Sequence, residues 1–429
     1  MSYYVLPRLN ITYEFSPRVN SGLDKLQPYI SNSLIHYTSE THKLLEKQIH
    51  LDSSNITLKT SIQLVHNYDF LFSPISGLDI PVSVITPQHS VYFDIIELYQ
   101  TLKIGECLCI NPYILACGKN CKSAVDALLY HCEGEAHYKL LDQYNSTNNL
   151  WLLGKLTTNM EYYERFEHAE KIISSCDLIY FEENDKSFSD VNDYVLYLIK
   201  AILVINLYQS RDGCAIIKIN TIYYKPIIEL LYILSSMYLK IYIMKPNSSN
   251  VMLDERYIVC KSFVTSNKYI INELHNLYME LRKVKFEVNI NSILKNKLHC
   301  HFLNKIEESN VIIGQQKLDA YTQINNLLKS KNKMEKIEIL QKHNIQRCIY
   351  WCDKHNIPYN VIPEDLTLFY SNKTTVNMEQ TTNTIDDDFY AYIESYYPDL
   401  HTDDKNADYY NEEDDTEIIC YNRIQLLKK

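Results

Sequence analysis

Two charged residues in the second half of the chain lie within apolar sequence, where charge is costly. Lys218 is inside the run Ala215–Ile219, and Glu255 immediately precedes the run Arg256–Cys260. An ionised lysine in a buried strand needs a carboxylate partner or a polar cleft. With such a partner and a tuned pKa, a lysine can deprotonate a hydroxyl group. A lysine near a strand end can also reach solvent along its aliphatic stem, so position alone leaves both interpretations open.

The segments around these residues alternate between strand-like and helix-like patterns. Strands are expected at 106–110, 137–141, 177–181, 214–219, 240–244 and 256–262, and helices at 122–132, 191–206, 225–238, 267–285, 316–331 and 336–356. This alternation predicts an α/β fold built from βαβ units around a mostly parallel sheet. The last two strands are joined by a polar segment without a helix, so we expect them to be antiparallel.

Composition divides the chain into four regions. Residues 1–85 carry no recognisable motif, 86–265 show the α/β pattern, 266–371 are mainly helical, and 372–429 are polar and acidic. The last region has 13 acidic residues and one lysine between Asp386 and Glu417, which is typical of a flexible interaction arm. We therefore expect a protein partner, bound through the surface or this acidic tail. The nearly neutral remainder is not typical of a strong polyanion binder, although local basic patches would still allow RNA contact.

Residues 213–260 follow the order strand, helix, strand, turn, strand and resemble the FtsJ-like RNA ribose 2′-O-methyltransferases. The amino-acid sequence of this segment is most similar to the cap-methylating, adrift-type branch, and the similarity extends over residues 86–265. The matching residues are Lys218, Lys245, Pro246, Ser249, Glu255 and Tyr257, whereas Asn250 stands where the family has arginine. The resemblance implies a Rossmann-like methyltransferase sheet with an antiparallel last strand, S-adenosylmethionine as cofactor and RNA as substrate.

The family uses a Lys-Asp-Lys-Glu tetrad to deprotonate the ribose 2′-hydroxyl. The resemblance assigns these four catalytic positions to Asp94, Glu182, Lys218 and Glu255. Asp94 reverses the charge of the first position, and Lys103 is the nearby lysine that could replace it. Glu182 moves the second carboxylate by about one bond, in a geometry that tolerates only ~0.5 Å of error. Two of the four positions are therefore altered.

The cofactor loop of the family reads Leu-Cys-Glu-Ala-Pro-Gly-Ala-Phe, and the matching stretch here is Leu108–Leu115 (LCINPYIL). The resemblance places Asn111, Pro112 and Tyr113 beside the cofactor. Tyr113 replaces the glycine and is predicted to fill space that the cofactor needs. Gly118 is the alternative if the loop is shifted, and Asp142 is the candidate carboxylate for the cofactor ribose.

Other features limit the class of protein. The twelve cysteines form no disulfide framework, and the clusters at 107–132 and 343–355 lack paired metal-ligand hooks, so we expect no metal site. No secretory signal and no uninterrupted apolar run of ~20 residues is found, which predicts a soluble protein without a membrane span. The many tyrosines, isoleucines, asparagines and lysines indicate an A+T-rich genome and resemble proteins of large cytoplasmic DNA viruses. The expected location is the virion and the host cytoplasm.

Two functions remain in competition. One is an active S-adenosylmethionine-dependent mRNA cap ribose 2′-O-methyltransferase. The other is a non-catalytic descendant that keeps the fold as a scaffold for a protein or RNA partner. The altered tetrad and the degenerate cofactor loop favour the second, because a fold does not guarantee its chemistry.

Overall fold

A computed structural model describes most of the first 367 residues. The described ranges are 3–9, 13–21, 26–51, 56–132, 136–141, 175–182, 191–264, 268–283, 288–330 and 333–367. Residues 1–370 form one compact unit and residues 371–429 form a second. All elements named below belong to the first unit. The acidic tail and the candidate ribose ligand Asp142 lie outside the described residues.

The central sheet has seven strands in the order β1-β7-β8-β6-β5-β3-β4. Their bounds are Tyr3–Leu6 (β1), Tyr113–Cys117 (β3), His137–Leu141 (β4), Cys176–Phe181 (β5), Gln209–Ile219 (β6), Tyr238–Met244 (β7) and Arg256–Phe263 (β8). Strands β4, β3, β5 and β6 pair in parallel. Strand β8 lies between β6 and β7 and is antiparallel to both. This order confirms the predicted Rossmann-like methyltransferase sheet with an antiparallel last strand.

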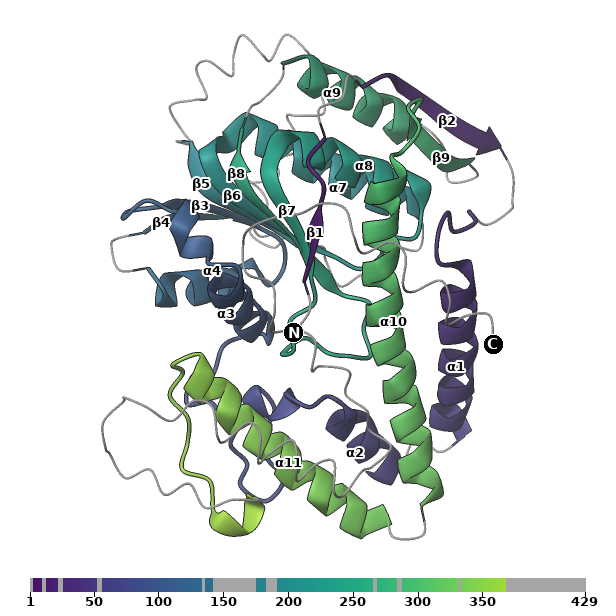
Figure 1. Cartoon of the computed structure of the whole chain (residues 1–429). Helices are drawn as coiled ribbons and strands as arrows, with labels where there is room; N and C mark the ends of the chain where they lie inside the picture. Colours follow the sequence, from purple (N-terminus) through teal and green to yellow (C-terminus); the bar gives the residue numbers. More distant parts are fainter. Residues whose placement is uncertain are drawn as a thin grey trace, which may run out of the picture. The chain divides into compact units, whose positions relative to one another are not determined.

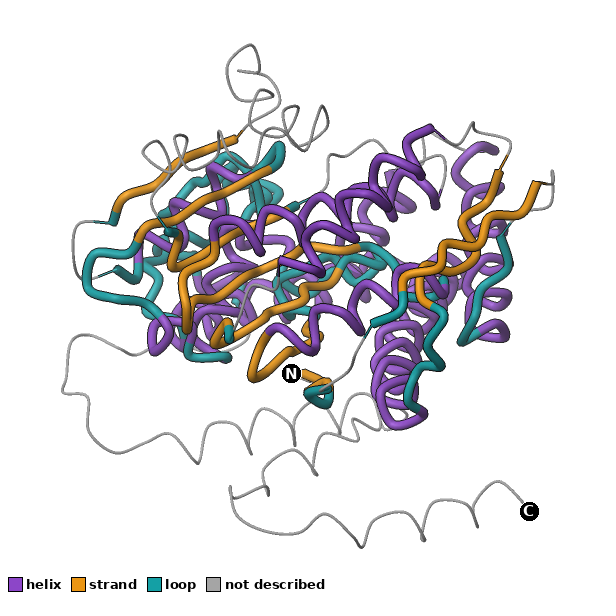
Figure 2. Tube along the Cα trace, turned by 90° about the horizontal axis from the view of Figure 1, so that it is seen from above, coloured by secondary structure: helices purple, strands orange, loops and turns teal. Residues whose placement is uncertain are grey.

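Helices cover both faces of the sheet (Figures 1 and 2). One face packs against α7 (Val191–Tyr208), α8 (Lys225–Met237) and α9 (Lys268–Lys283). The other packs against α3 (Val91–Thr101) and α4 (Cys121–Tyr130), and α11 (Lys333–Lys354) joins the same apolar cluster without lying on the sheet (Figure 1). Because both faces are buried, inner strands contain continuous apolar runs instead of alternating, as in Leu178–Phe181 of β5.

Segments from both ends of the chain extend this core. Strand β1 pairs antiparallel with β7, so the N-terminal region contributes an edge of the main sheet. Strand β2 (Phe15–Ser21) pairs with β9 (Val288–Leu294) in a separate two-stranded ribbon. Helices α1 (Asn32–Leu51) and α2 (Ile56–Val65) pack against the long helix α10 (Cys300–Lys329). At Gly314 of α10, a Cβ atom would lie only 2.5 Å from Leu34 of α1, so the absent side chain permits this close packing.

One predicted strand is wrong, and it is the one that matters for the cofactor loop. Residues Ile104–Cys107 form a short 3₁₀ helix (η2), and the strand predicted at 106–110 is instead β3, Tyr113–Cys117. Both segments are apolar and of strand length, so periodicity does not separate them. The other predicted strands of the α/β region are present. The predicted helix at 316–331 is the second half of α10, and two further 3₁₀ turns occur at Asp69–Leu71 (η1) and Glu364–Leu366 (η3).

Candidate active site

The carboxyl ends of β3 and β5 mark the point where the strand order reverses. From β3 the sheet continues to β4 on one side and to β5 on the other. Ligands of open α/β sheets bind at such a point, outside the carboxyl ends of the strands. Here β3 is followed by Gly118, and β5 is followed by Glu182. Gly118, and not Tyr113, therefore lies at the carboxyl end of β3.

Gly118 has a backbone conformation that side chains rarely adopt, with φ of 128°. A Cβ atom here would lie 2.3 Å from Cγ of Glu182 and 2.8 Å from its carbonyl oxygen. The Glu182 carboxylate accepts a hydrogen bond from the backbone N–H of Asn120, just before α4, and another from the Tyr180 hydroxyl at 2.8 Å. The space over the glycine is thus occupied by the protein's own glutamate.

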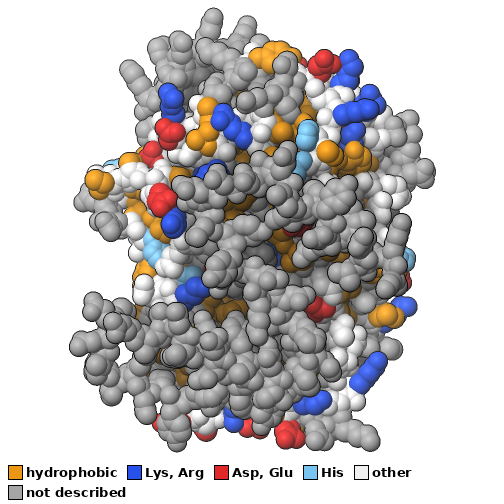
Figure 3. Space-filling view, in the orientation of Figure 1, with side chains coloured by type: hydrophobic (Ala, Val, Ile, Leu, Met, Phe, Trp, Pro, Cys, Tyr) orange, Lys and Arg blue, Asp and Glu red, His pale blue; other side chains and the backbone are white. Residues whose placement is uncertain are grey.

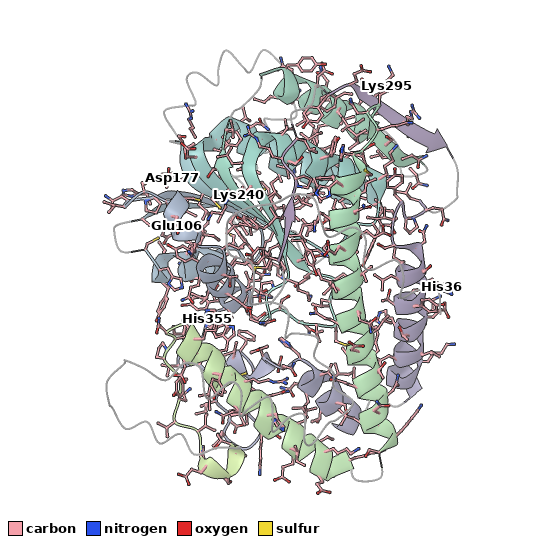
Figure 4. All side chains as sticks on the ribbon, viewed as in Figure 1. His36, Glu106, Asp177, Lys240, Lys295 and His355 are labelled. Carbon is pink, nitrogen blue, oxygen red and sulfur yellow. The ribbon has the colours of Figure 1, made fainter. Side chains whose placement is uncertain are left out.

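Tyr113 lies at the opposite end of the strand. It is the first residue of β3, and its backbone N–H donates to Asp177 Oδ2 at 2.9 Å. The same carboxylate accepts a hydrogen bond from the Ser210 hydroxyl, so Asp177 (labelled in Figure 4) holds the amino ends of the strands together. Asn111 and Pro112 precede the strand as well. The prediction that Tyr113 fills the cofactor space assumed that this residue follows the strand, whereas it begins the strand.

Lys218 and Glu255 form an ion pair across the neighbouring strands β6 and β8. Lys218 Nζ lies 2.9 Å from Glu255 Oε2, and the side chains are 9% and 25% exposed. Burial lowers the pKa of the Lys218 ammonium, but the surrounding carboxylates outweigh burial and the pKa is raised. Glu255 contributes most, followed by Asp94 and Glu182. All four predicted tetrad positions thus come together, although they hold three carboxylates around one lysine.

Asp94 projects from α3 into this group and is fully engaged by hydrogen bonds. Its carboxylate accepts from the Ser248 hydroxyl and from the Tyr257 hydroxyl, both at 2.8 Å. Burial raises the pKa of Asp94 to about 7, against the opposing effect of nearby Lys218. The carboxyl group at the position that the resemblance assigns to the first lysine is therefore bound to the chain itself. Lys103, the possible substitute, is at the far end of α3, where its carbonyl accepts from Lys261.

Sequence reasoning missed Glu97, one helical turn beyond Asp94. This carboxylate is fully buried and accepts the backbone N–H groups of Asn247 and Ser248 at 2.9 and 3.0 Å. Burial raises its pKa, and the hydrogen bonds oppose that shift. The signal was present in the sequence, because two acidic residues three apart in an otherwise apolar helix need polar partners.

Lys245 belongs to the same buried region. Its ammonium donates to the backbone carbonyls of Leu253 and Glu255 at 2.7 and 2.9 Å. Burial, reinforced by the nearby Arg256 charge, lowers the pKa of Lys245 to about 7. Lys245 therefore shapes the segment between β7 and β8 and fixes the backbone of Glu255, rather than facing a substrate.

The residues of this site do not fit S-adenosylmethionine in the arrangement described. A methionine moiety over Gly118 would have to displace Glu182 from the Asn120 amide. Within the described part of the chain, no group of three or more His, Cys, Asp and Glu side chains is placed to hold a metal ion. No described helix is long and apolar enough to cross a membrane. On the face in Figure 3, basic and acidic side chains of described residues lie interspersed.

Comparisons with known proteins find only solved structures of low similarity. No protein-family model and no curated protein matches the chain. A solved structure assigned as a ribosomal RNA methyltransferase from Plasmodium falciparum is 16% identical, with 42% of this chain and 99% of that one covered and a TM-score of 0.28. Human methyltransferase-like protein 13, solved with SAH, is 12% identical, with 46% and 91% covered and a TM-score of 0.24. Such values carry no argument about activity, and the fold assignment rests on the strand order.

Proposed function

We propose that this protein is an FtsJ-like methyltransferase homologue that has kept the fold and lost methyl transfer, and that it acts as a scaffold for a partner. The observation that carries the proposal is the position of Glu182. Its side chain fills the space over Gly118, and its carboxylate binds the Asn120 amide at the start of α4. A helix N-terminus at the end of the first strand is where such folds receive an anionic ligand group.

The charges around Lys218 support the same proposal. A general base works best when its pKa lies near the operating pH. The pKa of Lys218 is raised by carboxylates, so this ammonium keeps its proton at neutral pH. Asp94 removes the positive charge that a second lysine would supply beside a developing oxyanion. Lineage from the cap-methylating branch is supported by the ion pair between Lys218 and Glu255, which is formed at the predicted positions.

An active mRNA cap ribose 2′-O-methyltransferase is the second candidate. Gly118 favours it, because a glycine with positive φ stands at the switch point of the sheet. In this alternative, Glu182 turns away when S-adenosylmethionine binds, and the Lys218–Glu255 pair orients the ribose. The two candidates differ in whether the wild-type chain binds the cofactor at all.

Calorimetric titration with S-adenosylmethionine and with S-adenosylhomocysteine separates them. We expect no binding by the wild-type protein in the micromolar range and at least tenfold tighter binding by Glu182→Ala. Glu106→Ala, which removes an exposed carboxylate on η2, is the matched control and should behave as wild type. Transfer of a labelled methyl group to capped RNA is measured in parallel. Micromolar binding by the wild type, with turnover that is lost in Lys218→Ala, would overturn the proposal.

For the scaffold we propose a viral protein partner, contacted through the surface or the acidic residues 386–417, in the virion and the host cytoplasm. The net charge of −11 is concentrated in that segment, which favours a basic protein over RNA as the partner. Salt-dependent binding to capped RNA, measured by fluorescence anisotropy, tests the RNA alternative. Tight, salt-sensitive RNA binding that is unchanged by removal of residues 372–429 would contradict the assignment of a protein partner.

A further inference from the structure

The segment between β7 and β8, here called the Lys245–Glu255 loop, is bound mainly by elements outside the sheet. It has the sequence KPNSSNVMLDE and contains no glycine. Val251 and Met252 pack against a small apolar cluster that includes Tyr321 and Ile324 of α10. At its far end, Asp254 pairs with Lys317 of α10 at 2.8 Å. The loop therefore has a fixed end at α10.

Arg256 strengthens this fixed end. It is fully buried at the start of β8, and its Nη1 donates to Asn310 of α10 at 2.6 Å. Its guanidinium also lies over the Tyr223 ring, 5.9 Å from the centroid. A buried arginine held in this way is costly to move, because its charge would lose all of these partners together. Any opening of the loop would therefore pivot near Asp254 and Arg256.

The backbone amides at the near end of the loop bind one carboxylate. Glu97 of α3 accepts the backbone N–H groups of Asn247 and Ser248, and it also accepts the indole N–H of Trp351 of α11 at 3.2 Å. Three elements thus meet at one fully buried side chain. A buried carboxyl group that loses a hydrogen-bond donor is destabilised, so losing the Trp351 donor weakens the whole junction.

Helix α11 is attached to α3 beside that carboxylate. The Trp351 ring meets Phe93 of α3 edge-on, with centroids 5.6 Å apart. One turn later, Gln100 Nε2 donates to the His355 carbonyl at 3.1 Å, and Gln100 Oε1 lies 2.6 Å from His355 Nδ1. Figure 4 labels His355, just beyond the end of α11. These two polar contacts and one aromatic contact join α11 and the residue after it to α3. Asn344 of α11 also donates to the Leu64 carbonyl at 2.6 Å, and nine residues of the helix are buried.

The near end of the loop also covers the tetrad. The Ser248 hydroxyl donates to Asp94, whose charge acts on Lys218. Asp94, Glu182 and Lys218 are each less than a tenth exposed, and Glu255 is the one tetrad side chain that reaches solvent substantially. Moving residues 247 and 248 would therefore uncover Asp94 first and Lys218 behind it.

We propose that α11 is the closing element of this site: its contact with Glu97 through Trp351 holds the Lys245–Glu255 loop over Asp94 and Lys218, and release of α11 exposes them. The protein then has a closed form, as described, and an open form that pivots at Arg256. None of these contacts involves Gly118 or Glu182, so the closing role goes beyond the proposed loss of catalysis.

Amide hydrogen exchange at Asn247 and Ser248 tests this role in the full-length chain. Trp351→Phe keeps an aromatic ring against Phe93, removes the donor to Glu97 and makes the side chain smaller. We expect exchange at these two amides to accelerate at least tenfold, with increased acetylation of Lys218 by an amine-reactive reagent. Gln100→Ala, which removes the contact with His355, should change both quantities in the same direction by a smaller factor.

Phe302→Leu is the matched control, because it weakens an aromatic contact with Tyr232 on the opposite face of the sheet. It should leave the Asn247 and Ser248 amides at the wild-type rate. Unchanged exchange in both Trp351→Phe and Gln100→Ala would overturn the closing role. Equal acceleration by the Phe302→Leu control would also overturn it, since the loop would then open only with global unfolding.

Discussion

Two corners of the same site have different relations to the FtsJ-like pattern. At the first, Lys218 and Glu255 have the family's residue types and form an ion pair at 2.9 Å. At the second, Gly118 has a positive φ that favours glycine, and Glu182 occupies the space beside it. The first corner has the residue types that the resemblance predicts. The second has a glutamate where the resemblance predicts an aspartate.

The difference shows which residues also serve the fold. Lys218 and Glu255 lie on adjacent strands, and the Glu255 carbonyl is held by Lys245, so this corner stabilises the junction of β6 and β8 without any substrate. An empty space over Gly118 would add no contacts that stabilise the fold. A side chain that fills it gains hydrogen bonds from Asn120 and Tyr180. The residue types of Lys218 and Glu255 are therefore weaker evidence about catalysis than the side chain that fills the space over Gly118.

The largest expected effect comes from removing the only cation of the tetrad. Lys218→Met leaves Glu255, Asp94 and Glu182 facing one another without a positive charge. Removing one partner of a buried pair typically costs 3–5 kcal/mol, so we expect a loss of about 3 kcal/mol in the free energy of unfolding. Denaturant unfolding measures the loss.

Lys240→Met is the control for this variant. Lys240 is exposed on the neighbouring strand β7 (Figure 4), and its replacement should change stability by less than about 0.5 kcal/mol. Adding Asp94→Asn to Lys218→Met should restore part of the loss, because one of the uncompensated carboxylates is gone. A loss below about 1 kcal/mol in Lys218→Met would mean that the ion pair does not hold this corner together.

Much of the α/β core could be predicted because strong local patterns marked it. Residues 214–219 and 256–262 are mainly apolar runs of strand length, and both are strands. The error at the second corner also has a local cause. Residues 106–110 and 113–117 are both apolar and of strand length, so the local pattern did not separate them. Only pairing with β4 and β5 distinguishes Tyr113–Cys117 as the strand.

Other features depend on contacts that the sequence does not reveal. Strand β1 has four residues and is defined by its partner β7. Strand β2 pairs with β9 from the other end of the chain. The role of Glu97 depends on a loop some 150 residues away, as its hydrogen bond with Asn247 shows. Long-range pairing of this kind leaves little trace in local periodicity.

Gly118→Ala should give the next largest effect. The new Cβ would meet Glu182 Cγ at 2.3 Å, in addition to the strain of a positive φ, which costs about 1–3 kcal/mol by itself. Gly77→Ala separates the two causes, because Gly77 has φ of 92° and nothing within 4 Å of its Cβ position. We expect Gly118→Ala to cost at least about 1 kcal/mol more than Gly77→Ala in denaturant unfolding. In a Glu182→Ala background the difference should shrink, and an unchanged difference would contradict the packing of Glu182 on the glycine.

Asp94→Asn should alter the pH dependence of stability. Burial raises the folded-state pKa of Asp94 to about 7, above the unfolded value of about 3.9. Between these values the folded protein binds the proton more tightly, so wild-type stability falls relative to the variant as pH rises from about 4 to 7. The relative loss should reach about 2 kcal/mol or more at pH 8. Unfolding midpoints at each pH give the difference, with Asp126→Asn on α4 as a control that stays within about 1 kcal/mol. If the stability difference between the wild type and Asp94→Asn did not change with pH, the Asp94 carboxylate would lie in a more polar environment.

The smallest expected effect concerns Tyr113 and decides which corner controls cofactor access. Tyr113 lies at the amino end of β3, away from Gly118. Tyr113→Ala should therefore leave S-adenosylmethionine binding unchanged when Glu182 is present. In a Glu182→Ala background it should alter the measured Kd by less than about twofold. Binding that appears with Tyr113→Ala and not with Glu182→Ala would reverse the comparison of the two corners, because the tyrosine would then control access and the glutamate would only support the loop.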